Sequence, residues 1–216
     1  MKPLLTYFAV RGRAEPVRLM LEDLRVEYDE RRVTMEEWPT VKRGLMFGQM
    51  PTYREGDVFI DQSHAIYRYL ARKYDLYGDT ERERIRCDIV EEAFVDAQNN
   101  IGGFCWRPDF AQQRANYEET QLPVLLDKLQ RLLDLNREGM GWWVGERVSY
   151  VDFLAWNTLD YVRALSPRNL ERFERLKGAK LRLESRARIA AYLKSERRPP
   201  TLTVHVAPFG GTPETS

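Results

Sequence analysis

The sequence has few of the residues that cross-link chains or bind metals. Of its 216 residues, two are cysteine and two are histidine. Cys87 and Cys105 show neither a CxxC motif nor a Cys/His spacing typical of zinc sites, and two cysteines cannot build a disulfide framework. We therefore expect idle or buried reduced thiols and no metal site.

Long apolar runs and a charge imbalance are also absent. No stretch reaches the 18 or more apolar residues of a membrane-spanning helix, and the N-terminus MKPLLTYFAVRGRAEP becomes charged too early for a signal peptide. Lys and Arg number 34 against 33 Asp and Glu, which leaves a formal charge of +1. The sequence therefore predicts a cytoplasmic protein with no nucleic-acid partner and no membrane partner.

Several catalytic signatures are missing as well. The chain has no GxSxG elbow, no Walker loop, no HExxH and no GxGxxG after a strand. These absences argue against hydrolase and nucleotide-binding functions.

The first 80 residues change hydrophobic period repeatedly, as a mixed α/β domain does. We predict strands at 3–9, 26–33, 50–53 and 58–60, with a hairpin turn at 55–57 before the last. Helices are expected at 14–24 and from Asp61–Ser63 onward, and a shorter one between the second and third strands. The order β-α-β-(α)-β-β-α indicates one small mixed sheet with helices packed on it.

From Glu81 onward the pattern becomes helical. Two apolar stripes follow helical spacing: Ile85, Ile89, Ala93, Ala97 and Ile101, and then Leu122, Leu125, Leu126, Leu129, Leu132 and Leu133. Ser149–Asp152 resembles a capping box before a helix that is apolar nearly all round, which we expect to be central. A further helix at 187–193 ends before Pro199–Pro200. We therefore divide the chain into a domain at 1–75, a linker at 76–80, a helical domain at 81–198 and an irregular tail at 199–216.

A few polar and aromatic residues suit a small, charged, zwitterionic ligand. The candidates are Tyr7, Arg13, Trp38, Lys42 and the Gln62–Ser63 pair. Ser63 stands where a helix N-terminus offers free N–H groups to a carboxylate. Alternatively it is only a helix cap, which contributes about 1 kcal/mol, and Tyr7 is only a core tyrosine.

Five motifs in order resemble those of one family. They are YFAVRGRAEPVR at 7–18, EEW at 36–38, FGQMP at 47–51, QSHAIYRYLA at 62–71 and VSYVDF at 148–153. The chain resembles cytosolic glutathione S-transferases, closest to the pi class, with sigma-type enzymes as near relatives. The resemblance implies a thioredoxin-like N-terminal domain with a mixed four-stranded sheet and an all-helical C-terminal domain.

The resemblance also implies a glutathione site. In the family, the residue at Tyr7 donates a hydrogen bond to the glutathione sulfur, which favours the nucleophilic thiolate. The positions that match the family's glutathione contacts are Arg13, Trp38, Lys42, Gln49, Met50, Gln62 and Ser63. Pro51 matches a cis proline, and Asp96 matches an acid that reaches the site from the partner subunit of a homodimer. Glutathione is then a co-substrate, and no prosthetic group is expected.

Other positions match the electrophile pocket and the subunit contact. The pocket positions are Phe8, Val10, Arg11, Met35 and Trp106. Trp106 stands where the pi pattern usually has tyrosine, so a hydroxyl donor is replaced by an indole N–H. Phe47 matches an aromatic key that inserts into the partner subunit.

The leading interpretation is an enzyme that conjugates glutathione to small hydrophobic electrophiles in detoxification. A ligandin-like or crystallin-like binding protein would keep the fold with little chemistry. A sigma-like prostaglandin isomerase would use the same thiolate on an endoperoxide. A glutaredoxin-like enzyme is least favoured, since Tyr7 stands where it needs cysteine. The sequence indicates neither the natural electrophile nor a role for the tail.

Overall fold

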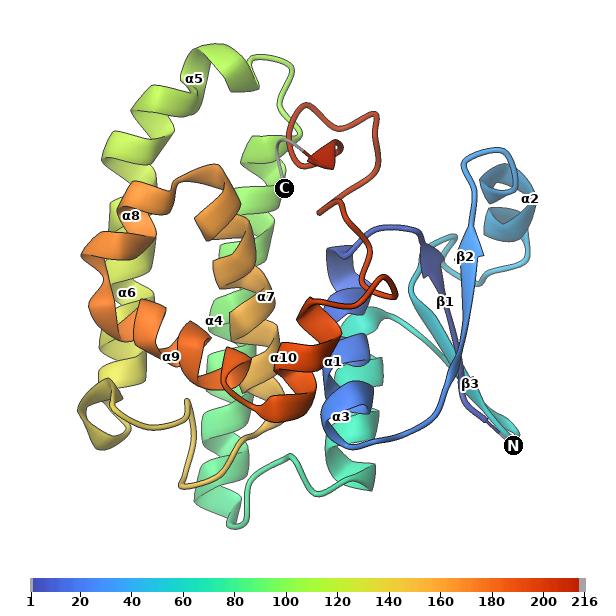
Figure 1. Ribbon diagram of the computed structural model, residues 1–216, viewed down its shortest axis with the longest axis horizontal. Coiled ribbons are helices and arrows are strands. Elements are labelled where there is room, and N and C mark those ends of the chain that lie inside the picture. Colours follow the sequence, from blue (N-terminus) through green and yellow to red (C-terminus); the bar gives the residue numbers. More distant parts are fainter. Residues whose placement is uncertain (1, 214–216) are drawn as a thin grey trace.

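The N-terminal part forms a four-stranded mixed sheet with three helices. In the computed structural model, which describes residues 2–213, the strand order is β2-β1-β3-β4 (Figure 1). β1 pairs with β2 in parallel and with β3 in antiparallel, and β3 and β4 form an antiparallel hairpin. The elements are β1 (Leu4–Phe8), α1 (Glu15–Asp23), β2 (Asp29–Val33), α2 (Trp38–Arg43), β3 (Thr52–Glu55), β4 (Val58–Asp61) and α3 (Ser63–Lys73). The expected element order and mixed sheet are confirmed.

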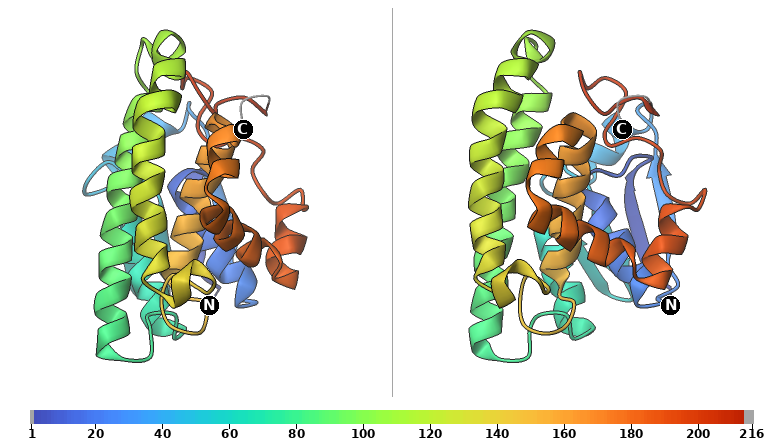
Figure 2. Two further views of the ribbon diagram at one scale, coloured as in Figure 1. Left: turned by 90° about the vertical axis from the view of Figure 1, so that its left-hand side faces the viewer. Right: turned by 60° about the vertical axis from the view of Figure 1, so that its left-hand side comes forward.

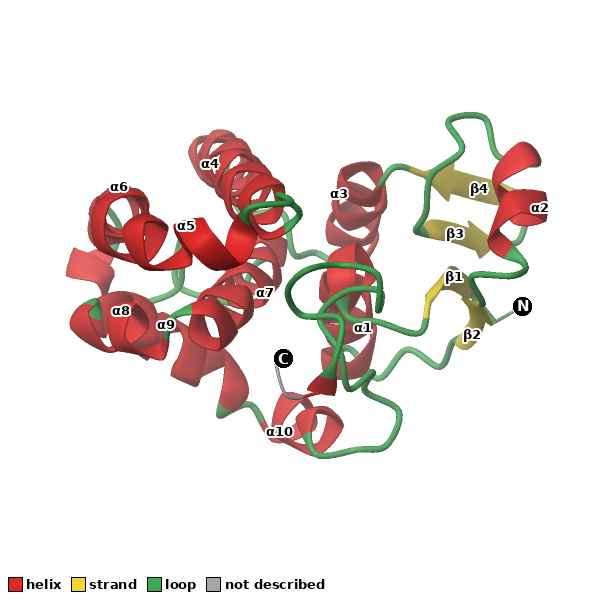
Figure 3. Ribbon diagram, turned by 90° about the horizontal axis from the view of Figure 1, so that it is seen from above, coloured by secondary structure: helices red, strands yellow, loops and turns green. Residues whose placement is uncertain are grey.

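Two helices lie between the sheet and the rest of the chain. Figure 3 shows α1 and α3 side by side on the inner face of the sheet, whereas α2 lies on the outer side. Leu5 and Tyr53 of the sheet are fully buried against Val17, Leu21 and other apolar residues of these helices. This packing directs the carboxyl end of β1 toward the junction between the two parts of the chain.

The C-terminal part is all helical (Figure 2). Its helices are α4 (Glu81–Cys105), α5 (Phe110–Asn116), α6 (Leu122–Asp134), α7 (Tyr150–Leu165), α8 (Pro167–Arg172), α9 (Glu174–Glu184) and α10 (Ala187–Leu193). Helix α7 is buried along most of its length and packs against α1, α4, α8 and α9. The central position expected for this helix is confirmed.

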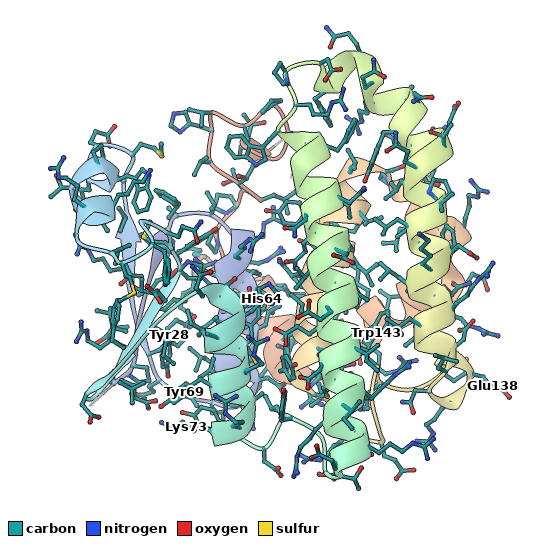
Figure 4. The ribbon with its side chains drawn as sticks, turned by 180° about the vertical axis from the view of Figure 1, so that it is seen from behind. Tyr28, His64, Tyr69, Lys73, Glu138 and Trp143 are labelled. Atoms are coloured by element: carbon teal, nitrogen blue, oxygen red, sulfur yellow. The ribbon has the colours of Figure 1, made fainter. Side chains whose placement is uncertain are left out.

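The capping box of α7 forms as predicted. The Asp152 carboxylate accepts hydrogen bonds from the Ser149 N–H at 2.8 Å and from the Trp143 N–H at 3.0 Å. Trp143, labelled in Figure 4, meets the ring of Phe94 edge-on at 4.8 Å, which attaches the loop before α7 to α4. Burial raises the pKa of Asp152 to about 6 although the N–H donors act in the opposite direction.

Helix α4 differs from the stripe expected from its sequence. Ile85 and Ile89 are 53% and 51% exposed, and the first half of the helix buries Cys87, Val90 and Phe94 instead. A step of four residues turns a helix about 40° beyond a full revolution, so the four such steps from Ile85 to Ile101 turn about 160°. The two ends of that stripe therefore face nearly opposite directions.

Residues 199–213, which we call the C-terminal strap, return to the N-terminal part. The backbone N–H groups of Arg11 and Gly12 donate to the carbonyls of Thr201 and Leu202, both at 2.9 Å. In Figure 1 the strap runs upward from α10 between the sheet and the helical part. Met1 and residues 214–216 of the expected domain and tail lie outside the described residues.

Candidate active site

A cavity of about 640 Å³ lies where the sheet, the helical part and the strap meet. It is lined by the end of β1, the segment before α2, the second half of α4, the middle of α7 and the strap. Seven of the residues expected at the site line it: Tyr7, Phe8, Val10, Arg13, Met35, Trp38 and Trp106. The structure thus gathers residues that are up to 99 positions apart in sequence around one cavity.

Tyr7 stands near the end of β1 with its hydroxyl beside the β1–α1 loop. That hydroxyl oxygen accepts a hydrogen bond from the Arg13 N–H at 3.2 Å. Because the Arg13 N–H occupies a lone pair, the hydroxyl's own proton can be donated to a ligand. Burial raises the pKa of Tyr7, and the Arg13 hydrogen bond and the charges of Arg18 and Arg13 only partly offset it. Tyr7 is therefore a protonated donor at neutral pH, not a base.

Gly12 allows the loop to approach Tyr7 this closely. Its φ is +44°, and a Cβ added to it would lie 2.5 Å from the Tyr7 hydroxyl oxygen. Only glycine lacks both the Cβ that would meet this oxygen and the strain of a positive φ. The Tyr7 hydroxyl is thus held against the backbone of the β1–α1 loop at Gly12, and no side chain separates them.

Arg13 connects the loop to two helices. Its Nη2 donates to Asn99 Oδ1 on α4 at 3.1 Å, and its carbonyl accepts a hydrogen bond from the Tyr67 hydroxyl on α3. The guanidinium is exposed at the edge of the cavity. It can therefore attract a carboxylate to the edge of the cavity.

The start of α3 has no side-chain cap. Gln62 is the N-cap residue at φ 68° and ψ 109°, and its side chain makes no capping hydrogen bond. Ser63 is the first helical residue and is 4% exposed, so the N-cap position that was the alternative for Ser63 belongs to Gln62. The first N–H groups of a helix have no partner within it, and the helix dipole favours an anion there.

Gln62 also contacts another residue expected at the site. Its Nε2 donates to Gln49 Oε1 at 3.0 Å. Gln49 precedes Met50, which is joined to Pro51 by the cis peptide bond that the resemblance implies. The segment before β3 and the start of α3 therefore meet, although neither Gln49 nor Gln62 lines the cavity itself.

His64 does not contact Gln49 or Gln62 but bonds to the helical part of the chain. Its Nδ1 lies 2.8 Å from a Glu91 oxygen on α4, and Figure 4 labels it near the start of α3. Glu91 also accepts from Arg68 and from the Tyr150 hydroxyl, each at 2.8 Å. Burial acts to raise the pKa of Glu91, but these three hydrogen bonds together lower it. These hydrogen bonds to Glu91 join α3 of the N-terminal part to α4 of the helical part.

The α2 segment carries two further expected residues. The ring of Trp38 meets Phe8 edge-on, with centroids 5.2 Å apart. Lys42 is exposed, and its Cγ would lie 3.2 Å from a Cβ on Gly48, whose φ is +58°. Lys42 therefore lies along the loop with its ammonium group in solvent.

The expected pocket role of Arg11 is not what the structure shows. Arg11 is 3% exposed and lies outside the cavity lining. Its Nη1 donates to Asp160 on α7 at 2.8 Å, and its Nη2 donates to the Pro200 carbonyl at 2.7 Å. The β1–α1 loop turns this side chain toward the opposite side of α7, so Arg11 holds the base of the strap.

Sequence reasoning missed most of the cavity wall. The additional lining residues are Gly12 in the β1–α1 loop, Gln98, Asn99, Ile101, Gly102, Gly103 and Cys105 on α4, Asn157, Thr158 and Tyr161 on α7, and Thr203, Val204, Val206 and Phe209 on the strap. Polar residues within the otherwise apolar α7 were a usable signal. The strap has no period that could have revealed it.

The strap is held against the cavity at both ends. The Tyr161 hydroxyl donates to the Leu202 carbonyl at 2.8 Å. Phe209 is 3% exposed and its ring centroid lies 5.5 Å from that of Phe110 on α5. The strap thus adds Val204, Val206 and Phe209 to the apolar part of the cavity wall.

Eight expected residues are outside the cavity lining: Arg11, Lys42, Phe47, Gln49, Met50, Gln62, Ser63 and Asp96. Asp96 is exposed on α4, and Phe47 is 57% exposed in the loop between α2 and β3. Both were expected to act across a subunit interface. A single chain brings neither of them to the site.

Within residues 2–213, no group of three or more His, Cys, Asp or Glu side chains could hold a metal ion. In the same range no helix is long and apolar enough to cross a bilayer.

Fold and site together define a two-domain transferase architecture, in which a thioredoxin-like sheet domain meets an all-helical domain at a tyrosine-lined cavity. Models of the glutathione S-transferase N-terminal and C-terminal domains match residues 3–72 and 95–196. The chain is 39% identical over 210 residues to glutathione S-transferase Mu 1 of Mus musculus, covering 91% of this chain and 93% of that protein. It is 38% identical over 218 residues to glutathione S-transferase Mu 4 of Rattus norvegicus, covering 95% and 97%. The chain therefore belongs to the glutathione S-transferase family and is a glutathione transferase.

Similarity to solved structures supports the same family. The Pi-class glutathione S-transferase of Onchocerca volvulus superimposes with a TM-score of 0.86 at 32% identity, covering 90% of this chain and 93% of that one. The expected pi class is not confirmed, because the sequence relatives named above carry the Mu name and this structure the Pi name.

Proposed function

We propose that the enzyme joins the thiolate of reduced glutathione to small hydrophobic electrophiles in the cavity beside Tyr7, as a detoxifying transferase. The observation that carries this proposal is the Tyr7 hydroxyl at the cavity wall, with a lone pair used by the Arg13 N–H and its proton left to donate.

A hydrogen bond from Tyr7 to the glutathione sulfur stabilises the thiolate relative to the thiol. A thiol with a pKa near 8.5 is only about 3% ionised at pH 7, whereas lowering the pKa by about two units, or roughly 2.7 kcal/mol, makes most of it thiolate. The thiol proton leaves to solvent. With an aryl halide, the sulfur–carbon bond forms and the halide departs with the bonding electron pair, so the reaction needs no oxidant and no metal ion.

The N-terminal part supports a matching glutathione position. We assign the γ-glutamyl carboxylate to the free N–H groups at the start of α3, with the Gln62 and Ser63 side chains. Met50, beside Pro51, would pair with the cysteinyl backbone. The glycyl carboxylate would then lie toward the cationic and aromatic side chains of Trp38 and Lys42. The Gln49–Gln62 hydrogen bond supports one continuous site.

Exposed apolar residues support a homodimer. Phe47, Ile85 and Ile89 are each more than half exposed, so a partner subunit could cover them. In such a dimer Phe47 would insert into the partner subunit, and Asp96 would reach the γ-glutamyl amine of the partner's glutathione. The complete site then needs two subunits.

The cytosol is the compartment we propose. Cys87 and Cys105 are free thiols, and burial raises the pKa of both to about 12. Unreactive thiols of this kind fit a reducing environment.

The test combines binding with turnover. Calorimetric titration of the purified protein with glutathione should show binding, and 1-chloro-2,4-dinitrobenzene should be conjugated with chloride release. Glutathione binding without turnover would favour a ligand-binding relative. Isomerisation of an endoperoxide without consumption of glutathione would favour the sigma-type isomerase. Absence of glutathione binding would refute the proposal.

A further inference from the structure

The peptide group between Gly12 and Arg13 is bonded on both sides. Its N–H, which belongs to Arg13, donates to the Tyr7 hydroxyl at 3.2 Å. Its carbonyl, which belongs to Gly12, accepts a buried hydrogen bond from Asn157 Nδ2 on α7 at 3.1 Å. The peptide is planar and trans, so its N–H and its carbonyl point in opposite directions. A contact that fixes the carbonyl therefore also fixes the direction of the N–H.

Glycine at position 12 leaves this peptide group free to rotate. Gly12 has a φ of +44° and no Cβ, so its own backbone does not prevent the rotation that would exchange the N–H and the carbonyl. After such a rotation the carbonyl oxygen would face Tyr7. The Tyr7 hydroxyl would then donate its proton to that oxygen, because a carbonyl can only accept. A residue that holds the carbonyl on the side of α7 prevents this exchange.

Asn157 is the residue that holds the carbonyl. Its side chain is 3% exposed, and its amide nitrogen must face Gly12 because a carbonyl cannot donate. Its Oδ1 has no hydrogen-bond partner within residues 2–213. In that range the contact with Gly12 is thus the one hydrogen bond of this side chain, so replacing the amide removes a single bond.

A second residue of α7 acts on the other polar group of Gly12. The Tyr161 hydroxyl donates to the Leu202 carbonyl at 2.8 Å, and the same carbonyl accepts from the Gly12 N–H at 2.9 Å. Asn157 and Tyr161 are four residues apart and so lie on one face of α7, the face that lines the cavity. That face positions both polar groups of Gly12, directly through Asn157 and by way of the strap through Tyr161.

We propose that Asn157 is a positioning residue, which holds the Gly12 carbonyl so that the Arg13 N–H stays on the Tyr7 oxygen and the Tyr7 proton stays free for the glutathione sulfur. The proposal rests on the transferase function proposed above. In this role Asn157 need not touch the sulfur or the electrophile. It acts through one peptide group, so its removal should weaken the donor at Tyr7 and leave the rest of the site intact.

The main test is the ultraviolet titration of bound glutathione in Asn157→Leu, which keeps a side chain of similar size and removes the amide. The pKa of the bound thiol should rise by about one unit, half of the two units expected for complete loss of the Tyr7 hydrogen bond. With 1-chloro-2,4-dinitrobenzene, kcat/KM should then fall about fivefold at pH 6.5 and change little at pH 8.5, where the thiol is mostly ionised in both proteins. A merely structural role of Asn157 would lower the rate equally at both pH values.

Asn169→Leu is the matched control. Asn169 is likewise a buried asparagine, 1% exposed, and its Nδ2 donates to the Glu118 carbonyl at 2.8 Å across 51 residues. It lies on α8 outside the cavity lining. This variant should destabilise the protein at least as much as Asn157→Leu and should keep the wild-type titration. If Asn157→Leu does not fold, Asn157→Ala removes the amide without steric demand, and its pKa shift should have the same direction.

A second readout needs no glutathione. In protein labelled with 3-fluorotyrosine, the fluorine NMR signal that is missing from Tyr7→Phe reports the ionisation of Tyr7. The pKa of Tyr7 should rise in Asn157→Leu, because the Arg13 N–H hydrogen bond that lowers it is weakened, whereas the charges of Arg18 and Arg13 stay the same. Asn169→Leu should leave this pKa unchanged.

The two readouts separate this proposal from the proposed function. An unchanged Tyr7 pKa in Asn157→Leu would overturn the positioning role, and so would a wild-type glutathione titration in Asn157→Leu when Tyr7→Phe is shifted. If bound glutathione titrates alike in the wild type and in Tyr7→Phe, the proposed action of Tyr7 on sulfur fails. A raised Tyr7 pKa in Asn157→Leu would then still support the contact through the Gly12–Arg13 peptide.

Discussion

Gly12→Ala should disable catalysis through the Tyr7 hydroxyl. The new Cβ would lie 2.5 Å from that oxygen and 2.8 Å from the ring atom Cε1, whereas ordinary contacts begin near 3.4 Å. The ring or the loop must therefore move by most of an ångström. A displacement of about 1 Å in a catalytic group can lower the rate about 100-fold. The φ of +44° adds about 1–2 kcal/mol of strain for a residue with a Cβ.

The expected result is an about 10- to 100-fold lower kcat/KM at pH 6.5, because the Tyr7 hydroxyl is displaced from the sulfur. The apparent pKa of bound glutathione should rise, and glutathione affinity should change little. A double-mutant cycle identifies the cause, because Tyr7→Phe removes the hydroxyl whose displacement is to lower the rate, although the ring atom Cε1 remains 2.8 Å from the Cβ. In the Tyr7→Phe background, Gly12→Ala should lower kcat/KM by less than twofold more. Additive effects of the two substitutions on log kcat/KM would refute the reasoning.

Three further outcomes test other parts of the account. Asp160→Asn should lower the free energy of unfolding by about 3–5 kcal/mol at pH 7, since it breaks a buried ion network. Burial acts to raise the pKa of Asp160, but Arg198 and the neighbouring cations outweigh burial and lower it. The stability that Asp160 contributes to the wild-type protein is thus present above pH 4 and lost on acidification. In urea titrations, the free energy of unfolding should therefore fall less between pH 7 and pH 3 in the variant than in the wild type. An equal fall in both proteins would contradict this. Phe209→Ala, which removes the contact with Phe110, should raise KM for the electrophile severalfold and leave KM for glutathione unchanged; a rise in both would argue against a strap that serves the electrophile. Phe47→Ser should shift sedimentation toward monomer and weaken glutathione binding, and a fully active dimer would show that this residue is not the subunit contact.

The regular part of the fold could be predicted from local sequence signals. Alternation and turn residues located the strands, and Ser149 with Asp152 marked the start of α7 through capping chemistry that depends only on nearby residues. Tyr7 and Arg13 were likewise found because their motif is local. The structure adds that the Arg13 backbone, not its side chain, contacts the Tyr7 hydroxyl.

Features that depend on long-range contacts could not be predicted. The direction of the Arg11 side chain follows from Asp160, which is 149 residues away. The strap lies over the cavity because its carbonyls bond to the backbone of Arg11 and Gly12, and no residue pattern in Thr201–Pro213 indicates this. The bond from Asn157 to the Gly12 carbonyl joins residues 145 positions apart.

The most direct test of the central claim is the ultraviolet difference spectrum of bound glutathione as a function of pH, in the wild-type protein and in Tyr7→Phe. If the Tyr7 hydroxyl stabilises the thiolate, the wild-type thiolate band should titrate near pH 6.5, about two units below the free thiol, and the Tyr7→Phe band should return toward pH 8.5. The same titration in both proteins would contradict the assignment of Tyr7 as the donor to sulfur.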